Sequence, residues 1–198
     1  MIKNNLNFLN NIQKKNLDSK SIKKFTKLFP KIFSKVFTDI NSSKKTLNIL
    51  NRKFNFNFEF KDLEKFKSFK TIAIIGMGGS ILGSEAVSHF LKEKINKKIY
   101  FFNDLNIKKI QNFKKKKNLN KVLFFVISKS GNTVETLSNF FTLKIIKKNS
   151  KNIIIISEKK NNLLYSLSKK FNLFYVEHKN YIGGRYSVLS EVGIVPAY

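Results

Sequence analysis

The amino-acid sequence predicts an α/β fold: a doubly wound, five-stranded parallel sheet flanked by helices and preceded by a helical N-terminal segment. From about residue 70 onward, five apolar runs are each followed by a stretch with helical periodicity. The runs are continuously apolar and do not alternate, which is typical of strands covered on both faces in a parallel sheet. The 198 residues and 42% hydrophobic content allow one full-sized domain with a substantial core.

The five units follow one another without long gaps, as expected for strands joined by crossover helices. The predicted strands are residues 71–75, 98–102, 122–127, 152–157 and 173–177. The helix-like stretches that follow them are residues 80–93, 106–113, 133–148, 161–171 and 185–193.

The first 66 residues differ from the rest, so we divide the chain into a helical segment, 1–66, and a sheet domain, 67–198. Apolar residues recur here at helical spacing, and we expect these helices to pack on the later domain, with Pro30 interrupting them. Residues 54–60, FNFNFEF, alternate strictly and suggest an exposed edge strand, although codon bias also explains Asn between phenylalanines. The helical positions are Leu6, Leu9, Ile12, Leu17, Phe25, Leu28, Ile32, Phe33 and Val36.

The formal charge of +27 at first suggests a nucleic-acid partner. The excess is nearly all lysine, with Arg52 and Arg185 as the arginines, and it accompanies many Asn, Ile and Phe residues. This composition is typical of A- and T-rich coding DNA. The lysines are also spread along the whole chain, without the interleaved arginines and aromatics of a nucleic-acid groove. We therefore expect no specific nucleic-acid partner.

The sequence contains no cysteine, which excludes disulfides, thiolate catalysis and Cys-ligated metals. The N-terminal residues have no continuous apolar core of a signal peptide, and nowhere do about 18 apolar residues follow one another. We expect a cytoplasmic protein that does not enter a membrane.

All eight glycines lie in three places, each at the end of a predicted strand. Glycine permits positive φ and close approach of the backbone to a ligand. In open α/β sheets, ligands bind outside the carboxyl ends of the strands, so three clusters there indicate one binding rim. The clusters are Gly76, Gly78, Gly79 and Gly83; Gly131; and Gly183, Gly184 and Gly193.

The first cluster, GMGGSILG, fits neither common glycine motif. The dinucleotide motif requires glycine at Ile81, and the nucleotide P-loop requires lysine where Ser84 stands. A glycine turn leading into a helix remains, whose first N–H groups and the Ser80 hydroxyl could hold an anion. Alternatively, Ser80 is a simple N-cap of a tight turn.

The second cluster, SKSGNT, offers several hydrogen-bond donors to one phosphate group. Ser128, Ser130 and Thr133 supply hydroxyls, Asn132 an amide, Lys129 a cation and Gly131 a permissive backbone, all just before a predicted helix. Three or four charge-assisted hydrogen bonds of roughly 1.5–3 kcal/mol each would hold a phosphorylated metabolite. The alternative is that Thr133 begins the helix and the serines are turn residues.

The third cluster, GGRYSVLSEVG, retains an arginine in a chain whose other cations are almost all lysines. This suggests that the planar, permanently charged fork of Arg185 is needed. A structural ion pair with a carboxylate such as Glu191 is the alternative.

Taken together, GMGGSILG, SKSGNTVET and GGRYSVLSEVG, in this order, resemble the glucose-6-phosphate isomerase family, whose core is built on the sugar-isomerase (SIS) domain. The resemblance covers residues 66–196 and extends to the helical lead-in. The middle motif is shared by many SIS proteins, whereas GGRYSVLS is close to a family signature.

The resemblance implies roles for particular residues. Gly79 and Ser80 would line the sugar-phosphate site, while Ser128, Lys129, Ser130, Gly131, Asn132 and Thr133 would hold the phosphate. Gly184 and Arg185 would lie beside the reacting carbons, with Arg185 stabilising a cis-enediol intermediate between glucose 6-phosphate and fructose 6-phosphate. It implies a homodimer at full length, and neither a metal nor an organic cofactor.

This chain departs from the family in lacking the proton-transfer glutamate. In the family, that glutamate, a ring-opening histidine and a late lysine follow the GGR motif, in a second SIS-like subdomain and a C-terminal part. We therefore expect this chain to be an N-terminal portion that is inactive alone. His89 and His178 match no catalytic motif, and we expect them to be structural or solvated. The alternative is a non-catalytic SIS module that senses a phosphosugar.

Overall fold

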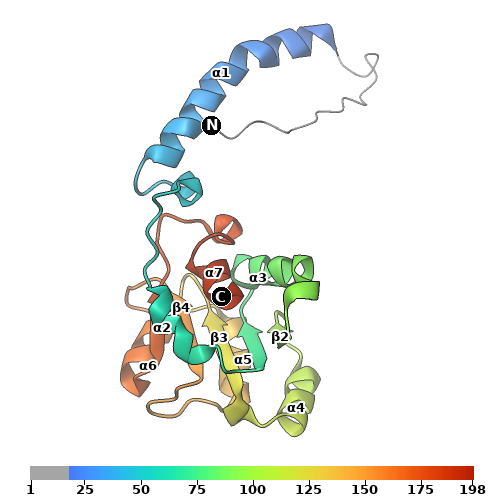
Figure 1. Cartoon of the computed structure of the whole chain (residues 1–198), viewed down its shortest axis with the longest axis vertical. Helices are drawn as coiled ribbons and strands as arrows, with labels where there is room; N and C mark the ends of the chain where they lie inside the picture. The colour runs from blue at the N-terminus through green and yellow to red at the C-terminus, as the bar shows by residue number, and fades with distance from the viewer. Residues whose placement is uncertain (1–17) are drawn as a thin grey trace.

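The computed structural model of the protein describes residues 18–198 (Figure 1). Five strands alternate with helices, and one long helix, α1 (Ser19–Asn41), precedes them. The strands are β1 (Thr71–Ile75), β2 (Lys98–Phe102), β3 (Val122–Ile127), β4 (Ile153–Ser157) and β5 (Phe174–Glu177). The other α-helices are α2 (Phe60–Leu63), α3 (Gly79–Phe90), α4 (Ile107–Lys116), α5 (Val134–Leu143), α6 (Leu163–Phe171) and α7 (Glu191–Ala197).

The five strands form one parallel sheet in the order β2-β1-β3-β4-β5. All five lie at the positions expected from the apolar runs, so the predicted fold class is confirmed. In register, Ile75 of β1 lies beside Val126 of β3, so both strands end at the same edge. The order reverses between β1 and β3, and such a switch point is where open α/β sheets bind ligands.

Each face of the sheet is covered by its own set of helices, which explains why the strands are continuously apolar. On one face, Ile110 of α4, Phe140 of α5 and Leu164 of α6 pack against Ala73, Phe124 and their neighbours. On the other face, Leu63, Phe66, Ile81 of α3 and Val192 of α7 pack against the intervening strand residues. Residues 60–66 thus contribute to the core of the sheet domain.

Two expected helices differ in extent. The helix expected over 133–148 ends at Leu143, because Lys144 adopts a left-handed conformation (φ 53°) and Ile145 turns into the core. The helix expected over 185–193 begins only at Glu191. Before it, residues 184–186 form a 3₁₀ turn, η6 (Gly184–Tyr186), that packs against the start of α3.

The N-terminal helix α1 contradicts two expectations. It continues through Pro30, and none of its residues is buried (Figure 1). Proline fixes a φ that suits a helix, and the carbonyl that it leaves unpaired can be hydrated because α1 is exposed. The prediction that the N-terminal helices pack on the sheet domain is therefore wrong for α1. Leu6, Leu9, Ile12 and Leu17 lie outside the described residues.

The alternating segment FNFNFEF does not form the suggested edge strand. Residues 54–59 are irregular, and Phe60 already begins α2. The Asn57 N–H donates to a side-chain oxygen of Glu191, 3.1 Å away, and not to a neighbouring strand. Phe56 and Phe58 contact each other, with ring centroids 5.2 Å apart.

The structure also bears on the membrane prediction. Between residues 18 and 198, no helix is both long enough and apolar enough to span a bilayer.

Candidate functional site

The three glycine clusters follow β1, β3 and β5 at the carboxyl edge of the sheet (Figure 1). Gly79 and Gly83 lie in α3 and Gly193 in α7, while the other glycines lie in the connecting segments. The loops after β1 and β3 are neighbours at the switch point. A Cβ built on Gly76 would lie 3.0 Å from the carbonyl oxygen of Ile127. The rim predicted from the sequence is thus assembled from segments far apart in the chain.

Three hydroxyl groups converge in the loop after β3. The Ser128 Oγ lies 2.8 Å from the Thr133 Oγ1 and 3.4 Å from the Ser130 Oγ, and the Ser130 and Thr133 oxygens are 3.4 Å apart. Thr133 occupies the N-cap position of α5, but its side chain makes no capping hydrogen bond. Thr133 thus precedes α5 without capping it through its side chain, and its hydroxyl turns into the cluster. The serines also serve as turn residues, because the Ser128 Oγ accepts from the Gly131 N–H at 3.2 Å and the Ser130 Oγ accepts from the Asn132 N–H at 3.3 Å.

Gly131 gives this loop its shape. Its φ of +71° lies in the left-handed region, and a Cβ there would meet the Asn162 Oδ1 at 1.9 Å. Asn162 caps α6 by accepting from the Tyr165 N–H, so the loop is packed directly against the start of a second helix. The Asn132 Oδ1 accepts from the Leu163 N–H at 2.8 Å, which is a second bond between this loop and the start of α6.

Lys129 reaches from this loop to the segments after β4 and β5. Its ammonium donates to the carbonyl oxygen of Asn180 at 2.8 Å and lies 3.6 Å from a carboxylate oxygen of Glu158. Glu158 also pairs with Lys160, 2.5 Å away. Lys129 therefore links three strand ends, and its charge is partly compensated.

Gly79 of the first cluster packs against Gly184 of the third. A Cβ on Gly79 would meet the carbonyl oxygen of Gly184 at 2.1 Å, so the two backbones are in direct contact. The Ser187 Oγ lies between them, 2.6 Å from the Gly184 oxygen and 3.2 Å from the Gly79 oxygen. This contact joins the loop after β1 to the loop that carries Arg185.

Ser80 is the second residue of α3, and the N-cap of α3 is Gly78 with a φ of +54°. The explanation of Ser80 as a simple N-cap is therefore wrong. Ser80 lies in the first turn of α3, where the helix dipole attracts anions, and its own N–H donates to the Met77 carbonyl oxygen at 3.1 Å.

Arg185 lies in η6 and is exposed. Among residues 18–198 it makes no ion pair, so the alternative of a structural pair with Glu191 is wrong. Glu191 is fully buried instead. It accepts from the Asn57 N–H and lies 3.8 Å from the Lys179 ammonium. Burial raises the pKa of the Glu191 carboxyl.

The two histidines lie in contrasting surroundings. His89 is exposed on α3, whereas His178, just beyond β5, is 1% exposed. Within the described part of the chain, neither ring nitrogen of His178 has a hydrogen-bond partner. Burial, with a smaller contribution from the charge of Lys129, lowers the pKa of His178 to about 4.

Sequence reasoning did not select the residues that hold the loops in place. Asn162 could have been found, because an Asn directly before an apolar helical run is a capping signal. Ser187 and Asn57 carry no such local signal, since their partners Gly79 and Glu191 lie 108 and 134 residues away.

Comparison with known proteins assigns the chain to a family. Residues 5–198 match the model of the phosphoglucose isomerase family. A probable glucose-6-phosphate isomerase from Methanococcus maripaludis is 36% identical over 178 residues, 79% of this chain and 40% of that protein. A glucose-6-phosphate isomerase from Methanocaldococcus jannaschii is 34% identical over 145 residues, 70% of this chain and 35% of that protein.

Solved structures agree with these relatives. A hypothetical protein from Thermus thermophilus superimposes with a TM-score of 0.68 at 20% identity, over 90% of this chain and 45% of that chain, which shows the fold alone. A glucose-6-phosphate isomerase from Chlamydia trachomatis gives a TM-score of 0.58 at 25% identity, over 68% of this chain and 27% of that chain.

The match in sequence runs almost the whole length of this chain, and it agrees with the three motifs at the carboxyl edge of the sheet. The chain spans less than half the length of the relatives it matches. It belongs to the phosphoglucose isomerase family.

Proposed function

We propose that the rim formed by the loops after β1, β3 and β5 binds the phosphate and sugar of a hexose 6-phosphate. The observation that carries this proposal is the convergence of the Ser128, Ser130 and Thr133 hydroxyls in front of α5, with the Thr133 hydroxyl left free of capping. A phosphate oxygen can replace these contacts among the hydroxyls with charge-assisted hydrogen bonds, and the helix dipole of α5 adds to the attraction.

We further propose that the chain contributes to the isomerisation of glucose 6-phosphate and fructose 6-phosphate. In that reaction a base takes the proton from C2 and returns it to C1, through a cis-enediol whose oxygen carries negative charge. Arg185 suits stabilisation of this charge, because it is an exposed cation with no competing carboxylate among residues 18–198. The Gly79–Gly184 contact fixes the backbone beside it.

Glu191, the glutamate of the third motif, is not a candidate for the base. Glu191 is fully buried and held by Asn57 and Lys179, so it does not suit proton transfer to a sugar. We infer that the base comes from the part of the relatives' length that this chain does not span. Binding without turnover is then expected of this chain alone. A homodimer at full length, the cytoplasmic location and the absence of a cofactor stay predictions.

Replacing Ser128 and Thr133 by alanine tests the phosphate site. Each lost charge-assisted hydrogen bond is worth about 1.5 kcal/mol or more, so the double variant should bind fructose 6-phosphate at least about tenfold more weakly. Isothermal titration calorimetry measures this affinity. Ser138→Ala, an exposed hydroxyl further along α5, is the matched control and should leave affinity unchanged.

Equal affinity of the double variant and the wild-type protein would refute the phosphate role of the cluster. The wild-type protein is also assayed with glucose 6-phosphate. Measurable isomerisation by this chain would show that it contains a base, and would overturn the inference that the base lies elsewhere.

A further inference from the structure

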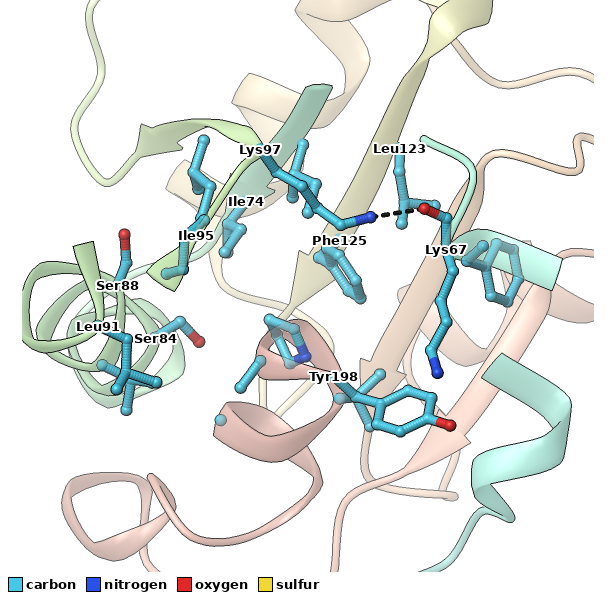
Figure 2. A pocket seen from close by; sticks show the side chains of 18 of the residues that line it. Lys67, Ile74, Ser84, Ser88, Leu91, Ile95, Lys97, Leu123, Phe125 and Tyr198 are labelled. Carbon is cyan, nitrogen blue, oxygen red and sulfur yellow. Dashed lines mark hydrogen bonds between the residues drawn. The ribbon is translucent and has the colours of Figure 1, made fainter. Parts of the chain in front are cut away.

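A cavity lies away from the rim, on the face of the sheet that α3 and α7 cover. Its volume is about 360 Å³, within the range of roughly 300–1,000 Å³ that is usual for small-molecule sites. None of the residues predicted for the sugar-phosphate site lines it. Its floor is the apolar surface of β1, β3 and β4, which Figure 2 shows around the Phe125 ring. The floor residues are Ile72, Ile74, Leu123, Phe125 and Ile154.

The walls of this cavity come from four segments. Ser84 and Ser88 approach from α3, as Figure 2 shows, and the other walls are residues 91–99, the end of α7 and residues 63–70. The lining is mainly apolar, so the cavity suits the hydrocarbon part of a ligand.

The charged side chains of the lining are all lysines. Lys67, Lys70, Lys94 and Lys97 line the cavity, and no Asp or Glu is among its described lining residues. The nearest compensating contact is Glu64, 2.8 Å from the Lys67 ammonium. Two of these cations act on a third, since burial and then the charges of Lys70 and Lys67 lower the pKa of Lys97.

Lys97 and Lys67 are held in position at this edge. The Lys97 ammonium donates to the carbonyl oxygens of Lys67 at 2.7 Å and Phe69 at 2.9 Å, and Figure 2 shows the first of these bonds crossing above the Phe125 ring. The Lys67 ammonium lies over the Tyr198 ring, 4.0 Å from its centroid. The Lys97 ammonium has a third N–H group, which neither of these bonds uses.

We propose that this cavity binds a small amphipathic anion, with its hydrocarbon part on the apolar floor and its acidic head at Lys67, Lys70 and Lys97. Apolar burial supplies affinity in the cavity, and the negative head relieves the repulsion that Lys67 and Lys70 exert on Lys97. A neutral ligand of the same length would gain the burial and leave that repulsion in place. The site is independent of the proposed isomerase function, because none of the residues proposed to hold the sugar phosphate lines it.

Titration calorimetry with octanoate tests the site, with octanol and acetate as comparisons. Octanoate should bind at least about tenfold more tightly than octanol, because octanol lacks the negative head. Acetate should not bind detectably, because it lacks the hydrocarbon chain. Lys70→Gln, at an exposed position, should weaken octanoate about tenfold and leave octanol unchanged. Lys115→Gln on α4 makes the same change of charge away from the cavity and should have no effect.

A second variant tests the location. Ser88→Phe places a ring in the cavity from α3 and should abolish binding of octanoate, while circular dichroism verifies that the variant is folded. The proposal is overturned if octanoate and octanol bind equally, if neither binds, or if Ser88→Phe binds octanoate normally. The protein is also sedimented with phosphatidylglycerol vesicles. If it binds them and Lys70→Gln abolishes this binding, the proposal is overturned, because the anion would then come from a membrane surface.

Discussion

Gly79 must lack a side chain for the backbones of the rim to pack as they do. A methyl group there would meet the carbonyl oxygen of Gly184, and backbone on both sides leaves little freedom to move apart. A Cβ on Gly184 meets nothing within 4 Å. The two glycines of one contact therefore have different steric requirements.

Gly79→Ala should lower the free energy of unfolding by about 2 kcal/mol or more, because the new methyl group forces two backbone segments apart. Gly184→Ala is the matched control and should change it by less than about 1 kcal/mol. Urea denaturation followed by circular dichroism measures both. Similar losses for the two variants would contradict the close contact as the cause.

His178 should make stability depend on pH. The pKa of its ring falls from 6.5 to about 4 on folding, chiefly because the ring is buried. Between these values the unfolded chain binds a proton that the folded protein does not, so the free energy of unfolding decreases as pH falls through this window. The loss below pH 4 is on the order of 3 kcal/mol.

The measurement is a series of urea titrations from pH 7 to pH 4. His178→Gln should flatten the dependence, whereas His89→Gln, at the exposed histidine, should leave it unchanged. Comparison with the variants is needed because burial raises the pKa of Glu191, which contributes in the opposite sense above the usual carboxyl pKa of 4.5. Identical profiles for His178→Gln and the wild-type protein would refute the assignment.

At the scale of elements, the pattern of apolar residues predicted the five strands correctly. It predicted the segments before the sheet poorly. The five apolar runs became strands because burial on both faces needs continuous apolarity, which is visible in the sequence. The alternation of FNFNFEF has the period of a strand, yet the Asn57 N–H binds Glu191. Tertiary contacts of this kind cannot be read from local periodicity.

The candidate site shows the same division. The motifs predicted which loops meet, because parallel strands bring their carboxyl ends to one edge. They did not reveal that Lys129 binds Asn180, or that Asn162 shapes the loop at Gly131. Those contacts depend on the distances between loops, which the order of residues alone does not specify.

The helix α1 provides a test at this scale. Phe29 and Phe33 are 64% and 58% exposed, so replacing both by serine should change the free energy of unfolding of the sheet domain by less than about 0.5 kcal/mol. Phe124→Ala in the core is the contrast and should cost about 3–5 kcal/mol. Urea denaturation distinguishes the two, and a loss of several kcal/mol from the α1 variant would show that this helix packs on the domain.

For the whole molecule, a net charge of +27 in 198 residues means that folding gathers many like charges into a small volume. Few acids offset them, and two of the five ion pairs in the described residues join exposed partners. Repulsion among the lysines therefore opposes the folded state.

Added salt should consequently stabilise the protein. Raising NaCl from about 10 mM to about 150 mM shortens the Debye length from about 30 Å to about 8 Å and screens this repulsion. The melting temperature should rise, and an equal osmolality of sucrose serves as the control for effects unrelated to charge. A melting temperature that falls with NaCl would show that favourable ion pairs outweigh the repulsion.

The strand order also has a consequence for synthesis on the ribosome. β1 lies inside the sheet, with β2 on one side and β3 on the other, and β2 is made before β3. Once Phe102 has emerged from the ribosome, the nascent chain can pair β1 with β2. The second edge of β1 stays unpaired until Val122–Ile127 emerge. During that interval the chain exposes unpaired backbone and isoleucine side chains, as an aggregation-prone edge does. Translation rate and ribosome-associated chaperones should therefore govern the yield of this protein most strongly between its second and third strands.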